Sequence, residues 1–199
     1  MSRYSLHVNR WSKCRRCDLY KTRHKVVLFR GKIPCDILFV GEAPGESENV
    51  IGRPFVGPAG KLLDLIIAKS VPDTISYGIT NIVACMPPKE EGNDNRKPDD
   101  KCVYACKDRL QELIDMAKPK AIICLGEVSR NYINGGSSND VEIDKSTTKI
   151  VYIRHPAFIL RVNPAQKLLL VQKSTIDISK VCDDITSMEE TSDKQSKIF

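Results

Sequence analysis

The sequence has no apolar stretch long enough to cross a membrane, since none approaches the roughly 18–20 residues that a spanning helix needs. Its first residues, MSRYSLHVNRWSKC, also lack the apolar core of a signal peptide. Hydrophobic residues make up 41% of the 199 residues and charged residues 28%, which is ordinary for a globular domain. We therefore expect an intracellular, cytoplasmic protein that makes no membrane contact.

The sequence has little excess of either charge, with 31 Lys and Arg against 25 Asp and Glu and a net charge of +6. Its basic residues nevertheless gather in the first 32 positions: Arg3, Arg10, Lys13, Arg15, Arg16, Lys21, Arg23, Lys25, Arg30 and Lys32. A solvated basic face and a nucleic-acid-binding surface both fit this segment.

Four short runs are apolar almost throughout: DILFVG (36–41), GITNIVAC (78–85), AIICLG (121–126) and KIVYIRHP (149–156). Runs of this kind indicate strands buried on both faces, as in a parallel sheet. Amphipathic helical patterns lie between them at 60–70 and 99–118. The sequence therefore predicts a three-layer α/β/α domain with a central four-stranded, mainly parallel sheet. We expect a single domain over residues 1–180 and a polar, mobile tail over 181–199.

The stretch GEAPGESENVIGRPFVGPAG, residues 41–60, follows the first of these strands. Ligands of such sheets bind beyond the carboxyl ends of the strands, where this stretch lies. Its glycines and Phe55 suit a tight pocket, but Glu42, Glu46 and Glu48 would repel a phosphate. The pattern argues against a phosphate-binding loop and raises the question of which other ligand it holds.

Eight cysteines are many for an intracellular chain, where structural disulfides are rare. Cys14 and Cys17 form a CRRC pair, Cys85 follows the second strand, and Cys102 and Cys106 share one face of a predicted helix. Four thiolates from this set could hold zinc or an iron–sulfur cluster, and spacing does not choose between them. The remaining three are expected to be small buried hydrophobic residues: Cys35, Cys124 and Cys182.

Five motifs follow the CRRC pair in order: LFVGEAPGESENVIGRPFVGPAGKLLD, ITNIVACMPP, NRKP, PKAIICLGEVS and RHPAFILR. Together they resemble the family 4 uracil-DNA glycosylases, the bacterial and archaeal type that carries a [4Fe–4S] cluster. The resemblance runs from about Cys14 to Arg161. It implies an enzyme of base excision repair that hydrolyses the N-glycosidic bond of uracil in DNA, and we expect it to be a monomer.

The resemblance also implies the cluster ligands, which are Cys14, Cys17, Cys85 and Cys106. The amino-terminal segment 1–35 would then belong to the cluster-binding part of the domain. Because the loop between Cys85 and Arg96 is longer than usual for the family, Cys102 remains an alternative fourth ligand. A branch that traps its product covalently has a basic insertion containing His. This chain has no His between His24 and His155, so we expect a turnover enzyme.

The resemblance also implies a uracil pocket built from the loops. Its members would be the backbone of Gly41, Ala43, Pro44 and Gly45, the ring of Phe55 and the amide of Asn81, with His155, Glu42 and Glu48 as catalytic residues. We expect Phe55 to stack on the base and Asn81 to bind its polar edge. His155 would stabilise negative charge on uracil O2. Glu42 would order the loop or a water, and Glu48 would lie near uracil C5.

Each of these residues also has a purely structural interpretation. Phe55 could belong to the core, Asn81 could hold a neighbouring loop, and His155 could cap a turn. Phe158, Ile159 and Leu160 are candidates for an apolar wedge that fills the gap left by a flipped nucleotide, with Arg161 on a phosphate. A hydrophobic helix start explains the same three residues.

Two rival functions remain open from the sequence. One is a non-catalytic DNA- or protein-binding module that keeps the fold and the cluster. The other is a zinc-dependent enzyme that processes nucleotides. The intact set of pocket residues argues against the first, and the visible absorbance of an iron–sulfur cluster would exclude the second.

Overall fold

The computed structural model of the chain describes residues 2–89, 96–134 and 141–196, with side chains as far as residue 188. Its strands are β1 (Arg30–Gly31), β2 (Ile37–Gly41), β3 (Tyr77–Asn81), β4 (Ala121–Leu125) and β5 (Lys149–Ile153). Its helices are α1 (Arg3–Trp11), the 3-10 helix η1 (Asp18–Lys21), α2 (Glu46–Ile51), α3 (Pro58–Ser70), α4 (Asp100–Ala117), α5 (Glu127–Asn134), α6 (Pro156–Ile159) and α7 (Pro164–Ser196).

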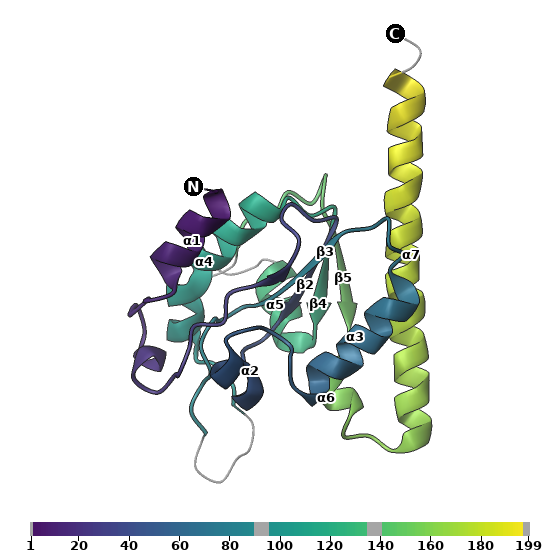
Figure 1. The fold of residues 1–199 in the computed structure, drawn as a ribbon. Coiled ribbons are helices and arrows are strands. Elements are labelled where there is room, and N and C mark those ends of the chain that lie inside the picture. The colour runs from purple at the N-terminus through teal and green to yellow at the C-terminus, as the bar shows by residue number, and fades with distance from the viewer. Residues whose placement is uncertain (1, 90–95, 135–140, 197–199) are drawn as a thin grey trace.

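The strands form one sheet in the order β1-β3-β2-β4-β5, and helices cover both of its faces (Figure 1). Strands β3, β2, β4 and β5 run parallel, and β1 pairs with β3 in the antiparallel direction. This confirms the predicted mixed α/β class with a mainly parallel sheet. The fifth strand was missed because β1 has only two residues, too few to show a hydrophobic period.

The sheet is buried on both faces because successive side chains of each strand point to opposite sides. On β2, Phe39 packs into the apolar cluster shared with α3 and α7. Its neighbour Leu38 packs into the cluster shared with α4. All five residues of β2 and of β4 are buried, which explains why their runs are apolar throughout rather than alternating. Cys35, Cys124 and Cys182 lie in these clusters as small buried residues, as expected.

Helix α7 continues past residue 180, where the sequence predicts the start of a separate tail. Val181, Cys182 and Ile185 are each at most 3% exposed and belong to the core cluster beside α3. The packed part of the domain therefore extends at least to Ile185, because three apolar residues at helical spacing give this polar segment a buried face. Beyond them, α7 projects past the sheet (Figure 1). Within the described residues, no helix combines the length and the apolarity required to span a bilayer.

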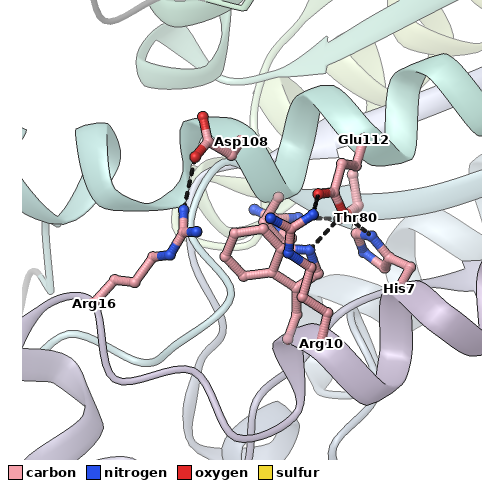
Figure 2. Close-up of polar contacts among 8 residues, drawn as sticks. His7, Arg10, Arg16, Thr80, Asp108 and Glu112 are labelled. Carbon is pink, nitrogen blue, oxygen red and sulfur yellow. Dashed lines mark hydrogen bonds and ion pairs between the residues drawn. The ribbon is translucent and has the colours of Figure 1, made fainter.

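The amino-terminal segment is fixed to α4 mainly by the carboxylate of Glu112, with a second contact at Asp108. Glu112 accepts hydrogen bonds from Trp11 Nε1 at 2.7 Å and Arg10 Nη1 at 2.5 Å, and it lies 3.1 Å from His7 Nδ1 (Figure 2). His7 and Trp11 are only 3% and 2% exposed. One helical turn away on α4, Asp108 pairs with Arg16 at 2.7 Å. These contacts hold the CRRC pair beside α4.

We expect Glu112→Ala to lower the free energy of unfolding by about 1–3 kcal/mol, because it leaves buried donors of α1 without an acceptor. Guanidinium denaturation followed by circular dichroism measures the change. Asp115→Ala is the matched control: Asp115 lies on the same helix, is exposed and accepts a hydrogen bond from Gln111, so this variant should stay within about 0.5 kcal/mol of the parent protein. Equal losses in the two variants would contradict a specific clamp at Glu112.

Candidate active site and cysteine-lined cavity

The loop after β2 is held together by the carboxylate of Glu48. Glu48 Oε1 accepts hydrogen bonds from the backbone N–H groups of Val56 and Gly57, both at 2.7 Å, and Oε2 accepts one from Gly45 N–H at 3.1 Å. This ties the start of α2 to the turn before α3. Glu48 thus orders the loop, because both of its oxygens accept hydrogen bonds from backbone donors. Ordering the loop was one of the two roles expected of Glu42, the other being to order a water.

Gly41, Phe55 and Asn81 meet where β2 and β3 end. Gly41 pairs with Asn81 in the parallel register. A Cβ atom at Gly41 would lie 2.4 Å from Asn81 Oδ1 and 2.6 Å from Phe55 Cζ, so only glycine lets the ring and the amide approach this closely. Phe55 has a positive φ of 53°, which a bulky residue rarely adopts and which is typical of functional sites.

Phe55 is also 7% exposed and belongs to the apolar core cluster beside α3. Its ring centroid lies 5.8 Å from that of His155, with an interplanar angle of 36°. The two interpretations of Phe55 are therefore compatible, because its ring packs on the core and also contacts His155.

The side chain of Asn81 is buried and has no hydrogen-bond partner among the described residues. The residue is 1% exposed, and neither Oδ1 nor Nδ2 is bonded to a group that the structure describes. An amide in this state carries a desolvation cost of about 1–3 kcal/mol, which a bound group with complementary polar atoms would offset. The structural interpretation, in which Asn81 holds a neighbouring loop through its side chain, finds no bond in the described residues.

His155 follows β5 and caps α6. Its Nδ1 accepts a hydrogen bond from Ala157 N–H at 3.1 Å. A ring nitrogen that accepts a bond carries no proton, so the proton of the neutral imidazole lies on Nε2. Burial lowers the pKa of His155 to about 4, and the charge of Arg161 acts in the same direction. The side chain is therefore a neutral donor at physiological pH.

A cleft of about 660 Å³ lies at the loops after β2 and β5. Gly41, Glu48, Phe55 and Asn81 are not among the described residues that line it. Residues 42–45, His155, Phe158 and Arg161 line it, so the structure brings together predicted residues from the loops after β2 and β5. Burial raises the pKa of Glu42, and the charge of Lys97 opposes this rise. Five other lining residues were not assigned to the site from the sequence: Arg96, Lys97, Glu127, Val128 and Ala157. They lie in the NRKP, LGEVS and RHPAFILR motifs, which were noted without assigning these side chains to the site.

The predicted apolar wedge is only partly present. Phe158 is 46% exposed and Leu160 is 37% exposed, so both are available to a partner. Ile159 is 0% exposed and packs in the core, which corrects its prediction as a DNA-contacting residue. The correction follows from helix geometry, because neighbouring residues of α6 point in different directions. The guanidinium of Arg154 lies 5.5 Å from the centroid of the Phe158 ring.

A second, small cavity lies between the amino-terminal segment and α4. Four cysteines line it: Cys14, Cys17, Cys85 and Cys106. These cysteines lie far apart in the sequence. The Glu112 contacts hold the CRRC pair beside α4 and so bring it to the same cavity as Cys106. Strand β3 ends at Asn81, earlier than the predicted run 78–85, and the buried stretch after it carries Cys85 to the cavity.

Cys102 does not line this cavity, although it is buried. Burial, with Asp99 and Cys17 beside it, raises the pKa of its thiol. Burial also raises the pKa of Cys85 to about 11, and the charge of Arg23 opposes the rise. Arg23 Nη1 lies 3.6 Å from Cys85 Sγ. Among the described residues, no three His, Cys, Asp or Glu side chains are arranged to hold a metal ion.

Comparison with known proteins gives the family. The family model of the uracil DNA glycosylase superfamily matches residues 29–176. The chain belongs to this superfamily, which confirms the family assignment made from the motifs.

Several curated relatives are type-4 uracil-DNA glycosylases. That of Archaeoglobus fulgidus is 36% identical over 160 residues, which cover 74% of this chain and 78% of the relative. That of Thermotoga maritima is 32% identical over 178 residues, covering 86% and 90%. That of Saccharolobus solfataricus is 40% identical over 122 residues, covering 61% and 54%.

We expect the His155 imidazole to titrate at about pH 4 rather than at the ordinary 6.5, because burial disfavours its charged form. Between these values the unfolded chain binds more protons than the folded one. The stability contributed by neutral His155 is therefore complete above about pH 6.5 and is lost as the pH falls towards 4. Proton NMR of the three His rings measures the midpoint, and His155→Asn assigns the resonance. A midpoint at or above 6.5 would contradict the buried, neutral donor.

Proposed function

We propose that this protein is a uracil-DNA glycosylase that hydrolyses the N-glycosidic bond of uracil in DNA, the first step of base excision repair. The single observation that carries the proposal is the Asn81 amide, which is buried beside Phe55 and Gly41 and whose two polar atoms have no partner in the described part of the chain. A flipped uracil supplies the complementary edge. Membership of the superfamily and the type-4 relatives support the same reaction.

Asn81 would recognise uracil through its amide. Oδ1 accepts the N3–H of uracil and Nδ2 donates to O4. Cytosine presents the opposite pattern at these two positions, so an amide held in one orientation discriminates against it. The close contact of Gly41 with both Oδ1 and the Phe55 ring supports a defined orientation. Phe55 would stack on the base, and Glu48 would keep the surrounding loop closed through its three backbone hydrogen bonds.

Bond breaking moves an electron pair from the C1′–N1 bond onto uracil, where the negative charge builds mainly at O2. His155 Nε2–H would donate to this oxygen as the charge develops. The donor is set in advance, because Ala157 N–H holds Nδ1 and therefore fixes the tautomer. The sugar becomes an oxocarbenium-like cation, and a water adds to C1′ and loses a proton. Glu42, at the edge of the cleft, would orient this water and accept the proton.

DNA would bind across the cleft, with the flipped nucleotide inside it. Exposed Phe158 and Leu160 would occupy the space that the nucleotide leaves in the stack. Arg161, which lines the cleft, would contact a phosphate, as would Arg96 and Lys97 on the opposite side. The partner is thus uracil-containing DNA, and an enzyme with this substrate works where the cell keeps its DNA.

We also propose that Cys14, Cys17, Cys85 and Cys106 hold a [4Fe–4S] cluster. The donor set fits, because four soft sulfur ligands face one cavity that contains no carboxylate. A single zinc ion would instead need its ligands to converge at about 2.3 Å from one point. When bound, the cluster supplies a cross-link between the amino-terminal segment, the stretch after β3 and α4.

Asn81→Asp should slow uracil excision by about 10²–10³-fold, because the carboxylate lacks the donor for O4 and its charge opposes the developing uracil anion. Single-turnover release of uracil from a single-stranded oligonucleotide measures the rate. Asn131→Asp on the exposed side of α5 introduces the same charge away from the pocket and should leave the rate unchanged. Equal rates for Asn81→Asp and the parent protein would remove Asn81 from the pocket, and no uracil release by the parent would leave only a binding module.

Cys106→Ser should lose most of the bound iron, whereas Cys102→Ser should retain it, because only Cys106 lines the cavity. Iron per chain and the absorbance near about 400 nm, measured on protein purified without oxygen, report the cluster. The reverse result, with full iron in Cys106→Ser and loss in Cys102→Ser, would exchange the two cysteines in the ligand set. Zinc in place of iron in the parent protein would contradict the cluster.

A further inference from the structure

Arg109 is an unusual residue in the interior of this protein. It lies on α4, three residues after Cys106, so the two side chains share one face of the helix. Its side chain lines the cysteine cavity, yet the residue is only 1% exposed. Arginine stays protonated in proteins, so the core holds a positive charge at this position.

The guanidinium group of Arg109 forms hydrogen bonds with the end of β3. Nη1 donates to Thr80 Oγ1 at 3.1 Å, and Nη2 donates to the carbonyl of Asn81 at 2.6 Å and to that of Ile82. Because the residue whose carbonyl is held is Asn81 itself, Arg109 sets the backbone from which the pocket amide projects.

In the part of the chain that the structure describes, no carboxylate forms an ion pair with Arg109, and its Nε has no hydrogen-bond partner. A buried charge is costly unless an opposite charge compensates it. Besides the hydroxyl and the two carbonyls that it binds, the guanidinium has the cysteines of the cavity as neighbours, Cys106 first among them. Neutral thiols do not compensate a cation, whereas the thiolates of a bound iron–sulfur cluster do.

Arg16 and Arg23 also line this cavity. Arg16 forms an ion pair with Asp108. Arg23 differs from Arg109 in two respects. It is only partly buried, so water screens part of its charge. Its bonds go to Cys85 Sγ and to the backbone carbonyl of Cys14, and none reaches β3. Among the described residues, Arg109 alone joins the cavity to the pocket strand by hydrogen bonds.

We propose that Arg109 is a positioning residue that couples the cysteine-lined cavity to the uracil pocket. Its charge balances the cluster thiolates, and its planar fork fixes the Asn81 peptide so that the amide meets the base in one orientation. The inference rests on the proposed cluster and the proposed pocket. Arg109 would couple the cluster to the active site. A change in the charge of the cavity changes how well the positive charge of Arg109 is balanced, and Arg109 holds the backbone of Asn81.

Two substitutions separate the charge from the geometry. Arg109→Gln removes the charge, and Arg109→Lys keeps it but cannot hold two carbonyls and a hydroxyl in one plane. Lys101→Gln removes a positive charge from the exposed start of the same helix and serves as the matched control. All proteins are used as purified with their iron, and circular dichroism checks that each is folded. The measurements are iron per chain, its loss to a chelator, the reduction potential of the cluster, single-turnover excision, and binding to DNA with an uncleavable uracil analogue.

Arg109→Gln should lose iron to the chelator about 10–100-fold faster than the parent. This is the effect expected when a residue that interacts with the metal ligands, here the cluster cysteines, is removed. Its remaining cluster should have a more negative reduction potential, because a nearby positive charge is gone. Arg109→Lys should keep its iron and its potential near those of the parent. Its excision should slow while DNA binding stays the same, because the amide is misplaced mainly for the transition state. Lys101→Gln should match the parent in every measurement.

In one outcome, the parent protein contains iron and excises uracil, and both Arg109 variants match it in iron content, reduction potential and excision rate. That result would overturn this inference and leave the proposed function standing. A parent without iron, or without excision, would contradict the proposed function and the inference with it. If Arg109→Gln does not fold, Arg109→Lys decides the coupling, since an unchanged excision rate in that folded variant overturns it.

Discussion

The pairing of Gly41 with Asn81 holds the ends of two parallel strands together where the pocket residues meet. Because Gly41 has no side chain, the Phe55 ring and the Asn81 amide come together over it. From α4, Arg109 binds the carbonyls of Asn81 and Ile82 at the same strand end. The proposed uracil pocket and the cysteine cavity therefore meet at one short segment.

This arrangement gives a physical reason for the proposed cluster, which takes no direct part in the proposed chemistry. The amino-terminal segment carries two of the four cavity cysteines but packs on the rest of the domain mainly through Glu112 and Asp108 of α4. Four thiolates on one cluster would close loops of many residues and add to that contact. The His155 side of the proposed pocket is not held by these cysteines. There His155 is fixed by a bond to the start of α6, and the exposed residues of α6 face the cleft.

Much of the fold could be predicted from the sequence. Runs such as AIICLG are apolar throughout because both faces of the sheet are covered, and that pattern is local enough to recognise. Strand β1 was missed because two residues carry no period. The packed part of α7 was placed in a tail because its apolar residues are few, although Val181 and Ile185 reach the core. Ile159 was assigned to the wedge because sequence neighbours cannot be sorted into buried and exposed without the axis of the helix.

The sequence by itself determined the chemistry available to this protein: an amide in a buried strand, a His at a strand end, a glycine-rich loop without phosphate chemistry, and a CRRC pair with further cysteines. These features depend on residue type and near neighbours, which a sequence displays directly. Only the tertiary structure decided which groups meet. It placed Cys106 rather than Cys102 in the cavity, bound both oxygens of Glu48 to the loop, and buried Arg109 between the cavity and the pocket. Such choices depend on contacts between segments up to a hundred residues apart, whose distances no local pattern encodes.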